Sequence, residues 1–71
     1  MKKEFSIIIE EDESGMLVAS VPGLRGCHTQ ARTLDALMKR IREAIELCLE
    51  VEGSKTVQPR FVGIQRMTVD V

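Results

Sequence analysis

The chain has 71 residues, of which 44% are hydrophobic and 30% are charged, so it has the composition of one small globular domain. A domain of this size buries only about 60% of its unfolded surface, which leaves a monomer marginally stable and favours oligomerisation. The formal net charge of −1 lacks the basic surplus that is typical of proteins bound to nucleic acid through phosphates. We therefore expect a single domain over residues 1–71 and a protein partner.

The location of the protein is predicted from what the sequence lacks. No segment approaches the roughly 20 apolar residues that are needed to cross a bilayer. The apolar run after Lys2 and Lys3 is too short for a signal peptide. Cys27 and Cys48 are the only cysteines, which is not the density of a secreted disulfide scaffold. We expect a cytoplasmic protein with reduced thiols.

Three short strands are predicted in the first half of the chain. Apolar and polar residues alternate over residues 5–9 and again over residues 16–21, as in half-buried strands. The acidic stretch 11–15 between them ends in glycine and predicts the loop of a β-hairpin. Pro22 ends the second strand because it has no N–H for a ladder, and residues 27–31 alternate as a short third strand.

A long amphipathic helix is predicted to begin after Thr33 and to end before Gly53. Thr33 is a competent N-cap, and glycine is favoured just after a helix. Leu47 and Val51 lie off the main apolar stripe and widen the apolar surface. The stripe at helical spacing comprises Leu34, Leu37, Met38, Ile41, Ala44, Ile45, Cys48 and Leu49.

Residues 54–59 are predicted to form a loop and residues 60–71 a fourth strand that is apolar on both faces. The expected fold is α+β in the order β-β-β-α-β, with one helix packed on one face of a four-stranded sheet. The second face stays apolar and uncovered, which favours self-association. The expected oligomer interface comprises Leu47, Val51, Val62 and Ile64.

The stretch from Ile7 to Glu52 resembles the N-terminal domain of HicB-type antitoxins, through short motifs that occur in the same order. The motifs are Ile7-Ile8-Ile9-Glu10, Glu11-Asp12-Glu13-Ser14-Gly15, Val18-Ala19-Ser20-Val21-Pro22-Gly23-Leu24, Gly26-Cys27-His28-Thr29-Gln30, Thr33-Leu34 and Arg42-Glu43-Ala44-Ile45-Glu46-Leu47. Each motif alone is weak, but the ordered set covers about two-thirds of the chain. Asp35-Ala36-Leu37 replaces the Glu-Glu-Ala that often follows the Thr-Leu pair.

The resemblance implies a truncated ribonuclease-H-like fold and the role of an antitoxin in a type II toxin-antitoxin system. HicB-type proteins bind and block HicA-type toxins, which are small ribonucleases that cut mRNA, and they commonly form homodimers or larger assemblies. Many carry a C-terminal segment that binds operator DNA. This chain ends at Val71 in a predicted strand, so we do not expect DNA binding of that kind. We also expect no enzymatic activity, no cofactor and no metal.

Four consecutive acids, Glu10, Glu11, Asp12 and Glu13, are the densest charged group in the chain. A ribonuclease-H-type site needs clustered carboxylates to hold two Mg²⁺ ions, and consecutive residues in a strand or turn splay apart. Two interpretations remain for these acids. They form either a solvated turn or a contact surface for a basic toxin.

His28 is the only histidine and therefore the only candidate imidazole acid or base. Its neighbour Cys27 points to the opposite face of a strand, so the two form no simple dyad, and the spacing of the cysteines is not that of a zinc site. We interpret His28 as a structural or surface residue and Cys48 as a small core residue. The alternative to an antitoxin is an orphan homo-oligomeric structural relative, or a weak RNA-binding or nuclease protein.

Overall fold

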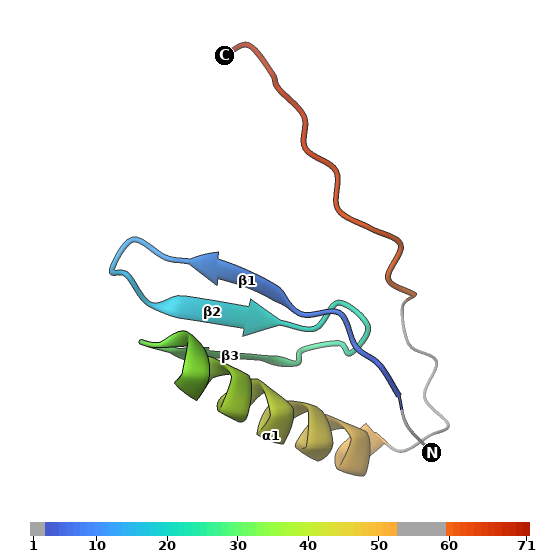
Figure 1. Ribbon diagram of the computed structural model, residues 1–71. Helices are drawn as coiled ribbons and strands as arrows, with labels where there is room; N and C mark the ends of the chain where they lie inside the picture. Colours follow the sequence, from blue (N-terminus) through green and yellow to red (C-terminus); the bar gives the residue numbers. More distant parts are fainter. Residues whose placement is uncertain (1–2, 53–59) are drawn as a thin grey trace.

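The computed structural model describes residues 3–52 and 60–71, and within them three strands precede one long helix (Figure 1). The strands form one antiparallel sheet in the order β1-β2-β3, and the helix lies across one face of it. The elements are β1 (Ile8–Glu11), β2 (Leu17–Ser20), β3 (His28–Ala31) and α1 (Leu34–Glu52). This arrangement confirms a small α+β domain of three strands and one helix. The first strand is shifted from its predicted bounds, because residues 5–7 lie before β1 and Glu10 and Glu11 lie within it.

The strand register fixes which side chains face α1. Ile9 lies opposite Ala19, which in turn lies opposite Thr29, so these three positions share the helix face of the sheet. Ile8 and His28 belong to the other face because successive side chains in a strand alternate. The alternation that predicted the strands therefore also determines which apolar residues can enter the core.

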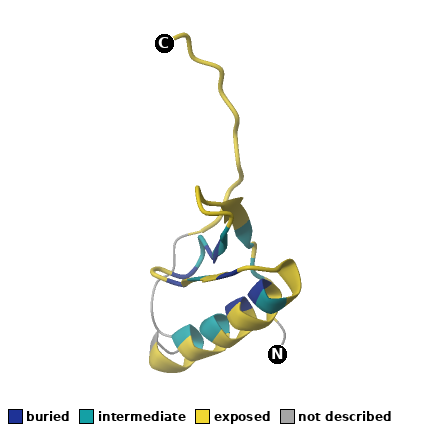
Figure 2. Ribbon diagram, turned by 90° about the vertical axis from the view of Figure 1, so that its left-hand side faces the viewer, coloured by how far each residue is buried: buried dark blue, intermediate teal, exposed yellow. Residues whose placement is uncertain are grey.

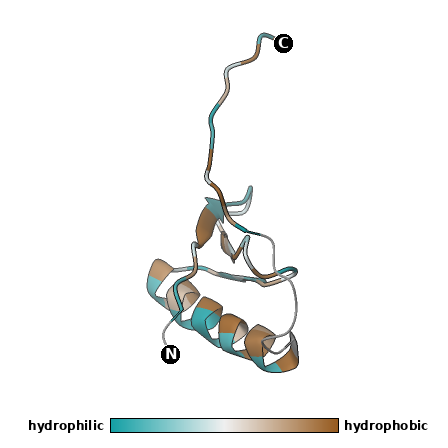
Figure 3. Cartoon of the chain, turned by 90° about the vertical axis from the view of Figure 1, so that its right-hand side faces the viewer, coloured by the Kyte–Doolittle hydropathy of each residue, from teal (hydrophilic) through white to brown (hydrophobic). Residues whose placement is uncertain are grey.

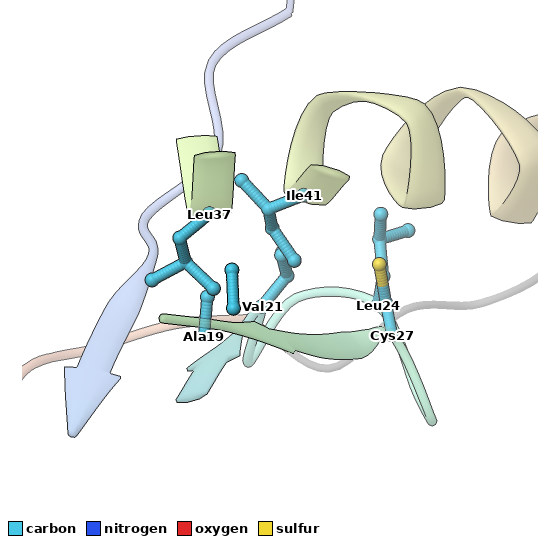
Figure 4. Close-up of a cluster of buried hydrophobic side chains, with 7 residues drawn as sticks. Ala19, Val21, Leu24, Cys27, Leu37 and Ile41 are labelled. Atoms are coloured by element: carbon cyan, nitrogen blue, oxygen red, sulfur yellow. The ribbon is translucent and has the colours of Figure 1, made fainter. Parts of the chain in front are cut away.

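The buried core consists of aliphatic side chains and Cys27, and Phe5, one of the two aromatic residues of the chain, packs against its edge. Helical periodicity places Leu37 and Ile41 at its centre, with 0% and 1% of their surfaces exposed. Figure 4 shows side chains from α1 pointing toward those from the sheet and from the connection after β2. The buried cluster comprises Ala19, Val21, Leu24, Cys27, Ala31, Leu37 and Ile41.

The connection between β2 and β3 is a tight, hydrogen-bonded loop. The Val21 N–H donates to the Cys27 carbonyl at 3.0 Å, the Leu24 N–H donates to the Val21 carbonyl at 3.0 Å, and the Cys27 N–H donates to the Leu24 carbonyl at 3.1 Å. Gly26 has a φ of 74°, a conformation that side chains with a Cβ rarely adopt. These bonds hold Leu24 against α1, so a loop residue becomes part of the core.

The start of α1 is capped as predicted. The Ala36 N–H donates to Thr33 Oγ1 at 3.2 Å, and the Leu37 N–H donates to the Thr33 carbonyl at 3.0 Å. The predicted helix end at Gly53 and the predicted loop 54–59 lie outside the described residues.

The largest difference from prediction concerns residues 60–71, which we call the C-terminal arm. We predicted a fourth strand here, but the sheet contains three strands in the part of the chain that the structure describes. The arm runs as extended chain away from the sheet and from α1 (Figure 1), and its residues are exposed (Figure 2). A strand forms only when its backbone groups find a ladder partner, and the arm lies beside none. The ribonuclease-H-like relationship stays a prediction.

Candidate functional site

The acidic hairpin loop is organised by Asp12. Its Oδ1 accepts hydrogen bonds from the Ser14 N–H (2.9 Å), the Ser14 hydroxyl (2.7 Å) and the Met16 N–H (2.9 Å). Gly15 closes the loop with a φ of 85°. The Ser14 hydroxyl, followed by the Met16 amide, lowers the pKa of the Asp12 carboxyl below its ordinary value of 3.8. Asp12 is therefore occupied in shaping the turn.

The other three predicted acids are exposed and lie on different sides of the hairpin. Glu10 is opposite Val18, whereas Glu11 is opposite Leu17, so the two glutamates point to opposite faces of the sheet. Glu13 lies in the loop beyond the strands. Among the described residues, these three side chains have no hydrogen bond or ion pair, so they are available to a partner that approaches the tip of the hairpin.

His28 and Cys27 occupy different environments, as the alternation of a strand requires. Cys27 is buried in the core with 3% of its surface exposed, whereas His28 is exposed at the start of β3. His28 and Arg25 border a shallow pocket of about 280 Å³ beside the loop between β2 and β3. Within residues 3–52 and 60–71, no three His, Cys, Asp or Glu side chains are placed to hold a metal ion.

A groove runs along the β1 side of α1 because the helix packs on β3 and β2 and leaves β1 uncovered. Ile9 faces the helix side of the sheet and is nevertheless 43% exposed. The groove, which we call the β1-side groove, has a volume of about 650 Å³ and an apolar floor between charged rims. It is lined by Lys3, Glu4, Phe5, Ile7, Met38, Ile41, Arg42, Ile45 and Glu46.

The two helix residues of the predicted oligomer interface lie on the opposite side of α1. Arg40 donates from Nη1 to the Gln30 carbonyl at 2.9 Å, so this side of the helix borders β3. Leu47 is two turns after Arg40, and Val51 is one turn later still, so both share that side. They are 61% and 77% exposed.

The two arm residues of the predicted interface, Val62 and Ile64, are exposed and do not contact Leu47 or Val51, because the arm leads away from α1 (Figure 1). Figure 3 shows hydrophobic residues along this arm, apart from the sheet and the helix. Within one copy these residues thus form two separate apolar surfaces, and their role in an oligomer interface stays a prediction.

Sequence reasoning missed the hydrogen bond of Arg40 and the β1-side groove. Arg40 is one of several basic residues scattered along the helix, and no pattern distinguishes it from its neighbours. The groove arises from a sideways placement of α1 that helical periodicity does not encode. The one available signal was Phe5, because a large apolar residue just before a short strand needs a covering surface.

No helix in the described ranges, 3–52 and 60–71, has the length and apolar character needed to span a membrane.

Comparison with known proteins gives consistent matches over nearly the whole chain. The family model described as "HicB_like antitoxin of bacterial toxin-antitoxin system" matches residues 5–69. A UPF0150 protein of Archaeoglobus fulgidus is 54% identical over 67 residues, which cover 93% of this chain and 94% of the relative. A UPF0150 protein of Synechocystis is 48% identical over 69 residues, covering 96% and 97%. A UPF0150 protein of Thermotoga maritima is 32% identical over 71 residues, covering 99% and 95%.

Proposed function

Because the chain belongs to the HicB-like antitoxin family, we propose that it binds and blocks a HicA-like toxin that cuts mRNA, without catalysis of its own. The observation that carries this proposal is the family match over residues 5–69, which includes the sheet, the helix and most of the C-terminal arm. Membership in an antitoxin family of a toxin-antitoxin system suggests a non-enzymatic role with a toxin as partner.

The hairpin tip supplies the chemistry for such a partner. A ribonuclease that binds mRNA presents basic side chains to phosphates. Glu10, Glu11 and Glu13 are exposed acids whose carboxylates can pair with the same basic side chains. Asp12 contributes indirectly by holding the loop in shape. Charges of this kind mainly raise the association rate and orient the encounter, while apolar contacts beside them set the dissociation rate.

We also propose that the protein acts in the cytoplasm as a homodimer or a larger homo-oligomer. The proposal is supported by the large apolar side chains that are exposed on α1 and the arm. A domain of this size is only marginally stable alone and gains stability when a second copy covers such side chains. The residues proposed to contribute to the interface are Leu47, Val51, Val62 and Ile64.

An inhibition assay tests the antitoxin role. A cognate HicA-like toxin is mixed with RNA, and the purified chain is titrated into the reaction. We expect RNA cleavage to stop near equimolar antitoxin, and we expect the chain alone with Mg²⁺ to leave single-stranded and structured RNA intact. Cleavage that persists at a large excess of the chain would contradict the proposal.

A second part of the assay tests the absence of catalysis. If the chain alone cuts RNA and the activity disappears in a His28→Ala variant, His28 is a catalytic acid or base and the chain is a nuclease. Retained folding of the variant, checked by circular dichroism, separates that result from simple unfolding.

A further inference from the structure

The C-terminal arm has the composition of a strand but has no ladder partner. Apolar side chains are exposed at both even-numbered and odd-numbered positions of the arm. Its backbone is extended, so its N–H and C=O groups are free to pair with a neighbouring strand. An apolar, extended segment of this kind is stable in water only when its backbone and side chains are covered. The large apolar residues of the arm are Phe61, Val62, Ile64, Met67, Val69 and Val71.

Of the two edges of the sheet, the β1 edge is the more open to a further strand. The other edge belongs to β3, where the Gln30 carbonyl already accepts a hydrogen bond from Arg40 at 2.9 Å. Among the described residues, β1 pairs with β2 alone, and the segment just before β1, which includes Phe5 and Ile7, lines the β1-side groove. A strand added beside β1 would therefore continue the sheet and cover the groove.

Charge spacing sets the register of such a pairing. Two exposed acids near β1, Glu4 and Glu10, are six residues apart, and two exposed bases of the arm, Arg60 and Arg66, have the same separation. Pairing Glu4 with Arg60 and Glu10 with Arg66 gives a parallel strand pair with two opposite-charge contacts on one face. Opposite charges at neighbouring positions of adjacent strands stabilise a sheet.

The same parallel register also matches the apolar residues. It places Ile64 beside Ile8, and it places Phe61 beside Phe5, which lines the β1-side groove. The reverse, antiparallel pairing would satisfy the same charges but would set Gln65 beside Phe5 at the apolar groove. Apolar residues meet at Ile8 in both arrangements, because the antiparallel pairing sets Val62 there. The parallel arrangement is favoured because it places Phe61, and not Gln65, at the groove.

We propose that the arm of one copy of this chain adds as a fourth, parallel strand to the β1 edge of a second copy, with Phe61 covering the β1-side groove. The arm leads away from its own sheet (Figure 1), so a second copy is the occupant that the geometry favours. This inference rests on the proposed homo-oligomer and specifies how its copies are joined: Ile64 lies beside Ile8 of β1 in the second copy, and Val62 lies beside Ser6 just before that strand. Leu47 and Val51 then contribute a separate contact between copies.

Disulfide trapping tests the pairing directly. Ser6 and Val62 are neighbours in the proposed register, at a separation that a disulfide spans. Two full-length chains with different affinity tags, both Cys48→Ala, carry Ser6→Cys and Val62→Cys respectively, and are mixed, refolded together and oxidised. We expect rapid formation of a covalent heterodimer. The matched control carries Thr68→Cys in place of Val62→Cys, and we expect little product because that position lies six residues further along the arm.

Other outcomes of the trapping experiment overturn the proposal in distinguishable ways. Faster trapping with Ile64→Cys than with Val62→Cys would show an antiparallel pairing. A single chain carrying both Ser6→Cys and Val62→Cys that closes only within itself, at monomeric mass, would show that the arm covers its own sheet. An oligomeric mass without any trapping would leave the homo-oligomer intact and exclude arm exchange. Toxin inhibition is measured separately and is unaffected by which of these results is found.

Charge reversal gives an independent measurement in chains without added cysteines. Arg66→Glu places a like charge beside Glu10, and we expect the dissociation constant of the oligomer to rise roughly 5- to 30-fold. Combining Arg66→Glu with Glu10→Arg should restore most of the affinity. Failure of the double variant to recover, with both variants folded by circular dichroism, would contradict the pairing of these two residues.

Discussion

The folded body, residues 3–52, and the C-terminal arm, residues 60–71, have similar apolar patterns but different structures. In the body, apolar side chains meet across α1 and the sheet, so that Leu37 and Ile41 are almost completely buried. In the arm, a comparable pattern remains exposed, with Val62 at 94% exposure. The comparison shows that an apolar pattern predicts that a segment will pack against another surface. The pattern does not say whether that surface belongs to the same molecule or to another one.

The largest effect is expected in the body, where Leu37→Ala removes a fully buried side chain next to the sheet. Leu-to-Ala changes in cores cost about 2–5 kcal/mol, which is comparable to the whole stability of a domain this small. The matched variant Leu34→Ala, on the same helix at a position that is 52% exposed, should change the free energy of unfolding by less than about 1 kcal/mol. Urea unfolding at one fixed protein concentration compares the two. Equal losses would show that both leucines are buried in solution.

The next largest effect is expected in the arm, where Ile64→Asp should break the assembly without unfolding the body. A carboxylate in an apolar contact must be desolvated without a partner, which strongly disfavours association. Sedimentation equilibrium at micromolar concentration should give the mass of the 8.0 kDa monomer, with an unchanged circular dichroism spectrum. Thr68→Asn is the control in the same arm and should leave the mass unchanged, because it adds no charge beside the acidic hairpin tip. A native oligomer mass in the Ile64→Asp variant would place the interface elsewhere.

A smaller effect is expected at the hairpin tip, where charge should matter more than packing. Replacing Glu10, Glu11 and Glu13 with Gln should slow toxin association by roughly tenfold at low salt and flatten its salt dependence. The dissociation rate should change little. Surface plasmon resonance with a HicA-like toxin measures both rates. A variant with Glu43→Gln, Glu46→Gln and Glu50→Gln on α1 removes the same number of charges and controls for net charge. If the two sets of variants behave alike, the hairpin tip is only a solvated loop.

The smallest effect concerns the titration of Asp12. Hydrogen bonds lower the folded-state pKa of this carboxyl below 3.8, so its stabilising contribution is complete above that value and is lost as pH falls through the lowered pKa. Asp12→Asn keeps an oxygen acceptor but removes the titration. Between about pH 5 and pH 2.5, the wild-type Tm should therefore fall slightly more than the Tm of the variant. Parallel Tm profiles would show that the turn does not depend on ionised Asp12.

The predictable part of the fold was the part with a periodic pattern. Strand alternation and helical spacing follow from which side of an element faces the core, and Thr33 was recognisable as a cap because its hydroxyl can accept from the first turn. Leu24 was not predicted to be buried, because a loop residue has no period and its position depends on the hydrogen bonds of the loop.

The candidate site was predictable as a set of residues but not as an arrangement. The four consecutive acids were visible in the sequence, yet the backbone of the turn assigns Asp12 a structural role and divides Glu10 from Glu11. The arm was recognised as strand-forming, but its pairing could not be inferred because a strand pattern contains no information about where the neighbouring strand comes from.

The Arg40 guanidinium occupies part of the β3 edge, because it donates to the carbonyl of Gln30 at 2.9 Å. Each chain then offers one arm and one open edge at β1. Two copies that exchange arms reciprocally close as a symmetric pair, whereas one-way donation from copy to copy builds an open array. Reciprocal exchange is therefore the arrangement that covers every arm and every β1 edge within a finite complex.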